Sequence, residues 1–316
     1  MKKIVVAMYD REGYTSKLAA YFCQHQKSLL DVRLFTAEES LCRFLQEKCT
    51  ELLIIGEQDL ELLHTLKHHV CRLIVLSEGQ CVRENIGQTV IFKYQSAESV
   101  LQMVLAIIAD DDRMQVPIQK KQVSGTRFIG VYAPFGGAGV SSFSQHLTKE
   151  YNLREKCLYI SLELFDGLAS SDPGKQNDVW NPEASGGMSE LIFFLRQHRE
   201  KISVKLDSLV KHTQGMYCIA AVDDYRDLYS MTISDLRCLL EVLSEETEYE
   251  KVVFDIGFFG EIPLELMKHL DTLYIPRADT ANQKRKQLSF TRLLHREGLF
   301  EVSEKIQYVE VNLSQV

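Results

Sequence analysis

The chain has 316 residues, of which 45% are hydrophobic and 25% are charged, a composition typical of a globular protein with about two domains. Its formal net charge of −8 argues against a bulk attraction for nucleic acid, which needs a basic face that releases counterions. The eight cysteines contain no C-x-x-C pair, so they indicate a reducing compartment rather than a disulfide framework or a zinc ribbon. No run approaches the roughly 20 apolar residues of a membrane span, and the first residues suggest a strand rather than a signal peptide. We therefore expect a cytoplasmic protein that does not insert into membranes and for which DNA is not a partner.

Short apolar or β-branched runs alternate with helical patterns in the first third of the chain. The runs predicted as strands cover residues 3–7, 31–35, 52–55, 73–76 and 89–92. Helices are predicted over residues 14–25, 37–47 and 96–108. Five such units make a small, doubly wound parallel sheet, so we predict a flavodoxin-like α/β domain over residues 1–110.

Polar residues stand at or just beyond the ends of these strands: Asp10 after the first, Ser77 after the fourth and Lys93 after the fifth. The third strand ends in Gly56 and is followed by Glu57, which is expected to point to the opposite face. This spacing resembles the receiver domain of two-component response regulators, in which an aspartate that accepts phosphate ends the third strand. Glycine holds that position here, so the resemblance implies an atypical receiver-like domain that docks or dimerises without forming an aspartyl phosphate.

A polar segment over residues 111–125, with acids, a proline and a glycine, is predicted to be a linker. After it, strands are predicted over residues 127–133, 157–162, 216–221, 251–256, 271–276 and 305–312. Helices are predicted over residues 141–151, 188–198, 234–243, 263–269 and 282–295, with Ser234 as a helix cap and Gly298 after the last helix. Residues 126–316 are therefore predicted to form a second, doubly wound parallel-sheet domain.

The sequence from Ile129 to Ser142 has the pattern of a buried strand, a glycine-rich turn and the start of a helix. This arrangement cradles phosphate on backbone N–H groups. An ordinary phosphate loop, G-x-x-x-x-G-K-[ST], needs a glycine at position 134 and a lysine at position 140, where this chain has Pro134 and Val140. The motif thus predicts where a nucleotide binds and that its phosphates are held in an unusual way.

Further segments follow this loop in a fixed order. After the loop over residues 135–142 come the segments 158–163, 187–191, 249–257 and 271–276. The ordered series resembles the MinD/ParA group of ATPases with a deviant Walker A loop. It is most similar to the TadZ/CpaE-like proteins of tight-adherence (Flp) pilus assembly, in which an atypical receiver precedes the ATPase-like domain. The resemblance implies a P-loop fold, a homodimer, partners among pilus or secretion assembly proteins, and recruitment to a cell pole or a membrane-associated machine.

The resemblance also implies a role for each matching residue. Ser141 and Asp255 would hold Mg²⁺, which keeps several waters and takes few protein oxygens. Glu163 matches the acid that positions the attacking water, whereas Pro276 and Asn312 match positions near the base. The N–H groups of Gly137 to Ser142 would receive the phosphates of ATP. The loop residues expected to bind this cofactor are Phe135, Gly136, Gly137, Ala138, Gly139, Val140, Ser141 and Ser142.

Two lysines of the family are missing. Loss of the loop lysine at Val140 removes a charge-assisted bond of about 1.5–3 kcal/mol, which lowers affinity roughly 10- to 150-fold. Phe135 replaces the signature lysine, which in relatives reaches the partner's phosphate and resembles an arginine finger, worth about 10³–10⁵ in rate. We therefore expect a nucleotide-binding localisation or scaffold factor of pilus assembly with little or no hydrolysis of ATP.

Other interpretations stay open. One is a slow but genuine ATPase that switches between monomer and dimer. Another is an NAD(P)-binding Rossmann enzyme, because Gly137-x-Gly139-x-x-Ser142 approximates the dinucleotide fingerprint and Glu163 ends the next strand, where a ribose-binding acid belongs. A third is that the glycines only let a helix pack closely on a strand.

The basic cluster over residues 284–286 lies at a predicted helix start, where ParA-type relatives touch DNA, and is expected to be a solvated face.

Overall fold

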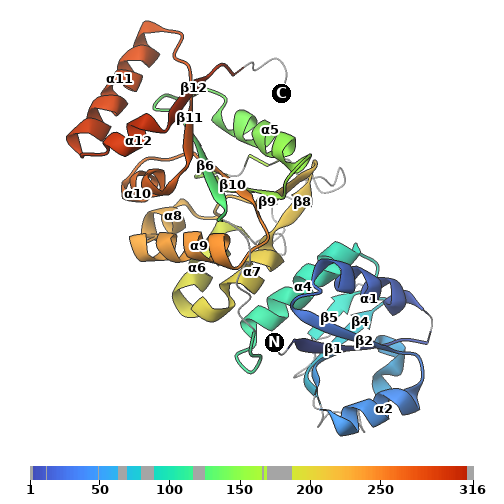
Figure 1. Cartoon of the computed structure of the whole chain (residues 1–316). Helices are drawn as coiled ribbons and strands as arrows, with labels where there is room; N and C mark the ends of the chain where they lie inside the picture. The colour runs from blue at the N-terminus through green and yellow to red at the C-terminus, as the bar shows by residue number, and fades with distance from the viewer. Residues whose placement is uncertain are drawn as a thin grey trace. The chain divides into compact units, whose positions relative to one another are not determined.

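The computed structural model describes residues 3–11, 13–48, 50–62, 70–79, 89–116, 125–165, 167–168 and 187–311. The chain divides into two compact units, Met1–Gln119 and Lys120–Val316 (Figure 1). Each unit is built on a sheet with helices packed against it, so the predicted fold class of two α/β domains is confirmed. The boundary between the units falls within residues 111–125, but residues 117–124 lie outside the described part, and the linker stays a prediction.

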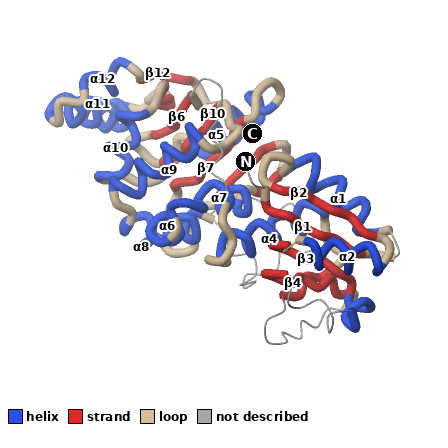
Figure 2. Tube along the Cα trace, turned by 60° about the horizontal axis from the view of Figure 1, so that its bottom comes forward, coloured by secondary structure: helices blue, strands red, loops and turns tan. Residues whose placement is uncertain are grey.

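The sheet of the first unit has five parallel strands in the order β2-β1-β3-β4-β5. This is the strand order of flavodoxin-like doubly wound sheets. The labelled strands lie side by side in one layer in Figure 2. Each predicted strand overlaps an observed one, and the observed strands are β1 (Ile4–Tyr9), β2 (Leu30–Phe35), β3 (Thr50–Gly56), β4 (Val70–Ser77) and β5 (Thr89–Phe92).

Helices cover both faces of this sheet. Figure 1 shows α1 and α4 on one side of the strands and α2 on the other, and α1 contacts α4. Leu41 and Leu45 of α2 pack against a core that includes Ala7 and Leu53 of the strands. Strand residues of the opposite phase are buried as well, as expected for a parallel sheet with two covered faces. The helical segments of this unit are α1 (Tyr14–His25), α2 (Glu38–Glu47), the 3₁₀ helix η1 (Glu57–Leu62) and α4 (Ala97–Asp110).

The carboxyl edge of this sheet corrects one expectation. Strand β3 ends at Gly56 and η1 begins at Glu57, so Glu57 does not continue the strand and does not point to its opposite face. Instead, the hydroxyl of Ser77, at the end of neighbouring β4, donates a 2.7 Å hydrogen bond to Glu57 Oε2. Lys93, which follows β5, pairs with Glu78 at 2.8 Å. A carboxylate is therefore present at this edge, but it belongs to the residue after Gly56, the position where the receiver resemblance implies a phosphate acceptor.

The second unit contains a seven-stranded sheet in the order β12-β11-β6-β10-β7-β9-β8. Six strands are parallel, whereas β8 pairs antiparallel with β9, so the sheet is not wholly parallel as predicted. Gln214 (φ 51°) and Gly215 (φ 79°) join these two strands in a two-residue turn of the kind that matches strand twist. The strands are β6 (Arg127–Tyr132), β7 (Cys157–Leu162), β8 (Lys211–Thr213), β9 (Met216–Ile219), β10 (Lys251–Ile256), β11 (Thr272–Pro276) and β12 (Ile306–Val309).

Helices also lie on both faces of the second sheet. Figure 1 shows α5 on one side of the strands and α9 and α10 on the other. Gly298 follows α11 with a left-handed φ of 71°, the conformation typical of the residue beyond a helix end. The helical segments are α5 (Val140–Asn152), α6 (Met188–Gln197), the 3₁₀ helix η4 (Arg199–Lys201), α7 (Ile202–Leu209), α8 (Tyr225–Ser230), α9 (Ile233–Glu245), α10 (Glu261–His269), α11 (Ala281–Arg296) and α12 (Phe300–Glu304).

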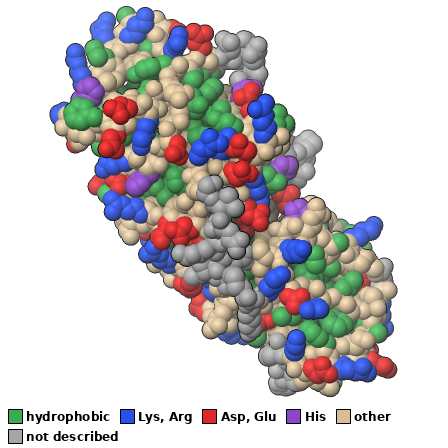
Figure 3. Space-filling view, in the orientation of Figure 1, with side chains coloured by type: hydrophobic (Ala, Val, Ile, Leu, Met, Phe, Trp, Pro, Cys, Tyr) green, Lys and Arg blue, Asp and Glu red, His purple; other side chains and the backbone are tan. Residues whose placement is uncertain are grey.

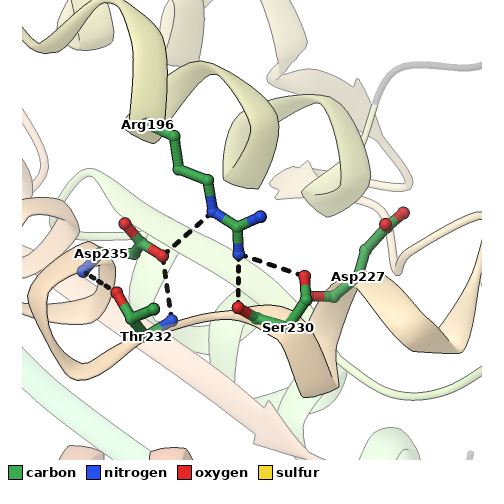
Figure 4. Close-up of polar contacts among 5 residues, drawn as sticks. All are labelled: Arg196, Asp227, Ser230, Thr232 and Asp235. Carbon is green, nitrogen blue, oxygen red and sulfur yellow. Dashed lines mark hydrogen bonds and ion pairs between the residues drawn. The ribbon is translucent and has the colours of Figure 1, made fainter.

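Arg196 of α6 ties together the ends of α8 and α9 (Figure 4). Its Nη2 donates to the Ser230 carbonyl at 2.5 Å, and its Nε donates to Asp235 Oδ2 at 3.3 Å. Asp235 also forms a capping box with Thr232, in which each side chain accepts from the other residue's N–H, at 2.9 and 3.2 Å. The cap of α9 is therefore Thr232, two residues before the predicted Ser234.

Acetyl phosphate is expected to leave the first unit unmodified, because Gly56 offers no carboxylate at the acceptor position and Glu57 is bonded to Ser77. Intact mass measured after treatment checks this. Gly56→Asp is the matched variant in which modification is expected; the atoms nearest to a Cβ at this position belong to the flexible end of the Gln58 side chain. A phosphoryl group mapped to residues 1–110 of the wild type would contradict the prediction.

Candidate functional site

The turn between β6 and α5 leaves a row of backbone N–H groups without partners. Gly137 and Gly139 have left-handed φ values of 69° and 71°, and Gly139 is the residue that caps α5. The N–H groups of residues 136–142 donate no hydrogen bond to any residue that the structure describes. Unpaired N–H groups in successive turn residues and in the first turn of a helix form a site for an anion.

The open space beside these glycines argues against a role in packing alone. If close helix-on-strand packing required them, an added Cβ would collide with a neighbouring element. At Gly136 and Gly137, however, no heavy atom lies within 4 Å of the position a Cβ would take. The loop is therefore free to receive a ligand, and the glycines at 137 and 139 are explained by backbone conformation.

A cavity of about 570 Å³ opens beside this loop. Its volume lies in the range of sites for small molecules and cofactors. It is lined by residues 132–142 and 256–259 together with Glu163 and Lys286. The whole predicted phosphate loop thus lines the cavity, along with the residues that follow β10.

Ser141 and Glu163 meet at the wall of the cavity. The Ser141 hydroxyl, in the first turn of α5, donates a 2.7 Å hydrogen bond to Glu163 Oε1, just beyond the end of β7. Glu163 also lies against the backbone after β10, where a Cβ at Gly257 would come within 2.7 Å of Glu163 Cδ. Glycine at 257 therefore makes room for the Glu163 carboxylate beside the loop.

Asp255 is buried behind the cavity wall that Ser141 and Glu163 form. Its side chain has an exposure of 0%, and the Tyr159 hydroxyl donates a 2.6 Å hydrogen bond to its Oδ2. Its Oδ1 is buried and has no hydrogen-bond partner in the described part of the chain. Burial, reinforced by the negative charge of Glu163, raises the pKa of Asp255 from 3.8 to about 6. Asp255 does not itself line the cavity, although the next residue, Ile256, does.

The side chains at this corner fit a magnesium ion. Mg²⁺ prefers oxygen ligands, keeps several waters and takes only one or two protein carboxylates. The Ser141 hydroxyl, the Glu163 carboxylate and the unpartnered Oδ1 of Asp255 are oxygens of this kind. Among the described residues, no group of three His, Cys, Asp or Glu side chains is placed to hold a metal ion by itself.

Phe135 and Val140 stand where the sequence resemblance implies lysines, and both pack with the apolar core. Phe135 is 7% exposed, and Val140 packs against a cluster that includes Ile129, Leu147 and Val253. Neither side chain carries a charge to the cavity that it lines. Both positions thus contribute packing, and no residue from 133 to 142 is a Lys or Arg.

Two predicted site residues are not brought to the cavity. Pro276 is buried at the end of β11 and does not line it, and Asn312 lies outside the described residues. Conversely, Tyr132, Phe259 and Lys286 line the cavity although sequence reasoning gave them no role there. Lys286 was recognised only as part of a basic cluster, because its distance in sequence from the loop hides their proximity.

No protein-family model matches the chain, and no curated protein matches it either. Similar solved structures include a protein of Borrelia burgdorferi assigned to plasmid partition and bound to AMPPNP. It is 14% identical, with a TM-score of 0.45 over 60% of this chain and 89% of that chain. Cobyrinic acid a,c-diamide synthase from Mycobacterium smegmatis, with a bound ATP analog and magnesium, is 13% identical, with a TM-score of 0.40 over 58% and 72%. Apo McdA from Cyanothece is 17% identical, with a TM-score of 0.40 over 55% and 68%. At these identities the likeness concerns the fold alone.

Two further expectations concern DNA as a partner and insertion into membranes. Figure 3 shows Lys and Arg side chains interspersed with Asp and Glu on the drawn face of each unit. The expectation that DNA is not a partner stays a prediction. Of the helices that the structure describes, none has the length and apolar character needed to cross a membrane.

Replacement of Asp255 by Asn is expected to stabilise the ligand-free protein in a pH-dependent way. The raised pKa means that the folded state binds more protons than the unfolded state between about pH 4 and pH 6, so the wild type loses stability as pH rises through this range. Raising the pKa of Asp255 from 3.8 to about 6 lowers the free energy of unfolding by about 3 kcal/mol at pH values above both. Asp255→Asn removes the buried charge and keeps an acceptor for Tyr159, so its free energy of unfolding should exceed that of the wild type by up to this amount at about pH 8.

Urea unfolding followed by circular dichroism, without Mg²⁺, measures this difference. The advantage of Asp255→Asn should fall between about pH 6 and pH 4 and vanish below about pH 3, where the wild-type carboxyl is protonated in both the folded and the unfolded state. Glu304→Gln serves as the control, because Glu304 is exposed and its substitution removes no buried charge. An Asp255→Asn effect of equal size at both pH values would contradict the assignment.

Proposed function

We propose that the second unit binds ATP with Mg²⁺ as a MinD/ParA-type nucleotide-binding domain. The observation that carries this proposal is the row of unpaired N–H groups over residues 136–142 that borders a cavity of nucleotide size. The positive end of the α5 dipole lies at the same point and favours a negative charge.

Each residue of the corner has a task in this proposal. The loop N–H groups bind phosphate oxygens, and the Ser141 hydroxyl and Asp255 Oδ1 hold the magnesium ion directly or through its waters. Magnesium, when bound, supplies positive charge that neutralises the phosphates. Glu163, which accepts from Ser141 at 2.7 Å, would orient that hydroxyl and polarise a nearby water. Asp255 acts as a ligand only when deprotonated, so nucleotide binding that depends on Mg²⁺ should weaken below its pKa of about 6.

Hydrolysis is proposed to be weak because the loop offers no cation to the charge that develops in the transition state. The apolar side chains of Phe135 and Val140 are held by the core and cannot serve this purpose. The output of the protein would then be an interaction. Together with the sequence resemblance to TadZ/CpaE-like proteins, this supports a cytoplasmic localisation or scaffold factor of pilus assembly.

The geometry favours this proposal over an NAD(P)-binding enzyme. In a dinucleotide-binding Rossmann sheet, the strand that follows the first helix pairs with the first strand. Here β10 lies between β6 and β7. Glu163 is bonded to Ser141 at the phosphate loop, whereas a ribose-binding acid would lie away from the phosphates.

We further propose that the partner of this unit is a second copy of the chain. Tyr225 and Tyr229 of α8 are 50% and 57% exposed, and the Tyr229 ring lies 5.5 Å from that of Phe258, which lines the cavity. Exposed aromatic side chains beside a ligand site are typical of protein interfaces. A two-fold pair that meets on this surface would bring the two cavities close together.

Calorimetry is expected to show binding of ATP and Mg²⁺ with a dissociation constant of roughly tens to hundreds of micromolar, weaker than an intact loop because one charge-assisted bond is lost. Gly137→Ala should weaken binding at least about tenfold, since a Cβ strains the left-handed turn that aligns the N–H groups. Gly215→Ala is the matched control: it has the same kind of positive φ and open surroundings, but Gly215 does not line the cavity.

Phosphate release by the wild type is expected to stay near the uncatalysed background. Turnover of the order of 1 s⁻¹, typical of working enzymes, would contradict the proposed scaffold role and favour a genuine ATPase. Equal effects of Gly137→Ala and Gly215→Ala on ATP affinity would contradict the proposed site.

Light scattering at micromolar protein is expected to show a dimer when ATP and Mg²⁺ are present. Replacement of both Tyr225 and Tyr229 by Ser should shift the protein toward the 36.3 kDa monomer while leaving nucleotide affinity in place, because neither residue lines the cavity. Ser substitution of Phe193, which is also exposed but lies on α6, is the comparison. A monomer under all conditions would refute the dimer.

A further inference from the structure

Among the described residues that line the cavity, Lys286 is the one Lys or Arg. It comes from α11, more than a hundred residues after the phosphate loop. The loop itself carries no cation, because Phe135 and Val140 stand where related loops have lysine. Among the described lining residues, the cation therefore comes from a helix outside the loop.

Aromatic packing holds α11 against the cavity. Phe290 is 5% exposed, and its ring centroid lies 5.1 Å from that of Tyr132 and 6.1 Å from that of Phe259. Tyr132 and Phe259 both line the cavity and lie 5.9 Å from each other. Phe290 is thus the apolar anchor that seats this helix beside the end of β6.

Lys286 is one helical turn from this anchor. Residues four apart lie on the same face of a helix, and long side chains lean toward the helix N-terminus. The capping box of Thr280 and Gln283 fixes where the helix begins, with hydrogen bonds of 3.0 and 3.2 Å. The neighbouring cations Lys284 and Arg285 are on the same turn but do not line the cavity. Of the basic cluster, Lys286 therefore lines the cavity and the other two residues do not.

The ammonium group of Lys286 is available to a ligand. Its side chain is exposed, and it forms no ion pair with any residue that the structure describes. A lysine acts on phosphate as a flexible point charge, so it does not need to come from the loop itself. Glu163, on the same cavity wall, is positioned toward Ser141 and does not neutralise it.

We propose that Lys286 supplies, from α11 of the same chain, the phosphate-binding cation that the loop lacks. The inference rests on the proposed nucleotide binding of the cavity and deepens it, because it makes the site selective for ligands with a long phosphate chain. Affinity should then decrease from ATP to ADP to AMP. The difference in affinity between ATP and AMP should be smaller when Lys286 is replaced by an uncharged residue.

Calorimetric titration of the full-length protein with ATP, ADP and AMP in Mg²⁺ tests the assignment. Lys286→Gln is expected to weaken ATP binding about 10- to 100-fold, the effect of one charge-assisted bond, and to change AMP binding less than about twofold. Lys286→Arg should retain more affinity for ATP than Lys286→Gln, since the charge is kept. Higher ionic strength should narrow the gap between the wild type and Lys286→Gln, because an exposed charge is screened.

Lys284→Gln is the matched control, with the same change of charge on the same helix at an exposed residue outside the cavity. It should leave ATP affinity within about twofold of the wild type, as distant charges contribute little in salt. Equal ATP affinity of the wild type and Lys286→Gln, or equal losses in the two Gln variants, would overturn the role of Lys286 while leaving the nucleotide site intact. Failure of the wild type to bind any of the three nucleotides would overturn the proposed function, and this inference with it.

Discussion

The left-handed turn at Gly137 and Gly139 is the constraint on which the rest of the second unit depends. It lets the chain leave β6 and begin α5 at once, with the first N–H groups of the helix still unpaired. Because β6, β10 and β7 are parallel neighbours, the residues at their carboxyl ends reach the same edge of the sheet. Asp255 and Glu163 are near the turn for this reason. One backbone feature and one strand order thus account for the cavity wall and for the oxygens beside it.

Much of the fold could be predicted because its strands are short apolar runs and its helices are long and amphipathic. The exceptions have physical causes. Strand β8 has the sequence Lys-His-Thr, with no apolar run, and forms only because the turn at Gln214 and Gly215 pairs it with β9. Helices α7, α8 and α12 have at most eight residues, too few for a helical period to stand out. Ser234 is not the cap of α9, because Thr232 and Asp235, at the T-x-x-D spacing of a capping box, form their reciprocal hydrogen bonds two residues earlier.

Part of the candidate site could likewise be predicted from the sequence, and part could not. The loop and Asp255 could be located from sequence because local patterns mark strand ends and glycine turns. The contact of Ser141 with Glu163, and the room that Gly257 provides for it, depend on which strands are neighbours, so spacing along the chain does not reveal them. Lys286 is the clearest case, since its place beside the loop is fixed by the packing of Phe290. Sequence patterns thus predict the main chain of the site better than the side chains that complete it.

Phe135 has a consequence for how copies of this protein would act together. Its side chain is buried within its own unit, at the position where the sequence resemblance implies a lysine that reaches a neighbouring subunit. A residue enclosed in this way cannot be donated from one subunit to another. In a dimer, residue 135 of one subunit would therefore act only on the loop of its own chain, and a substitution at this position would not be complemented by residue 135 of the partner.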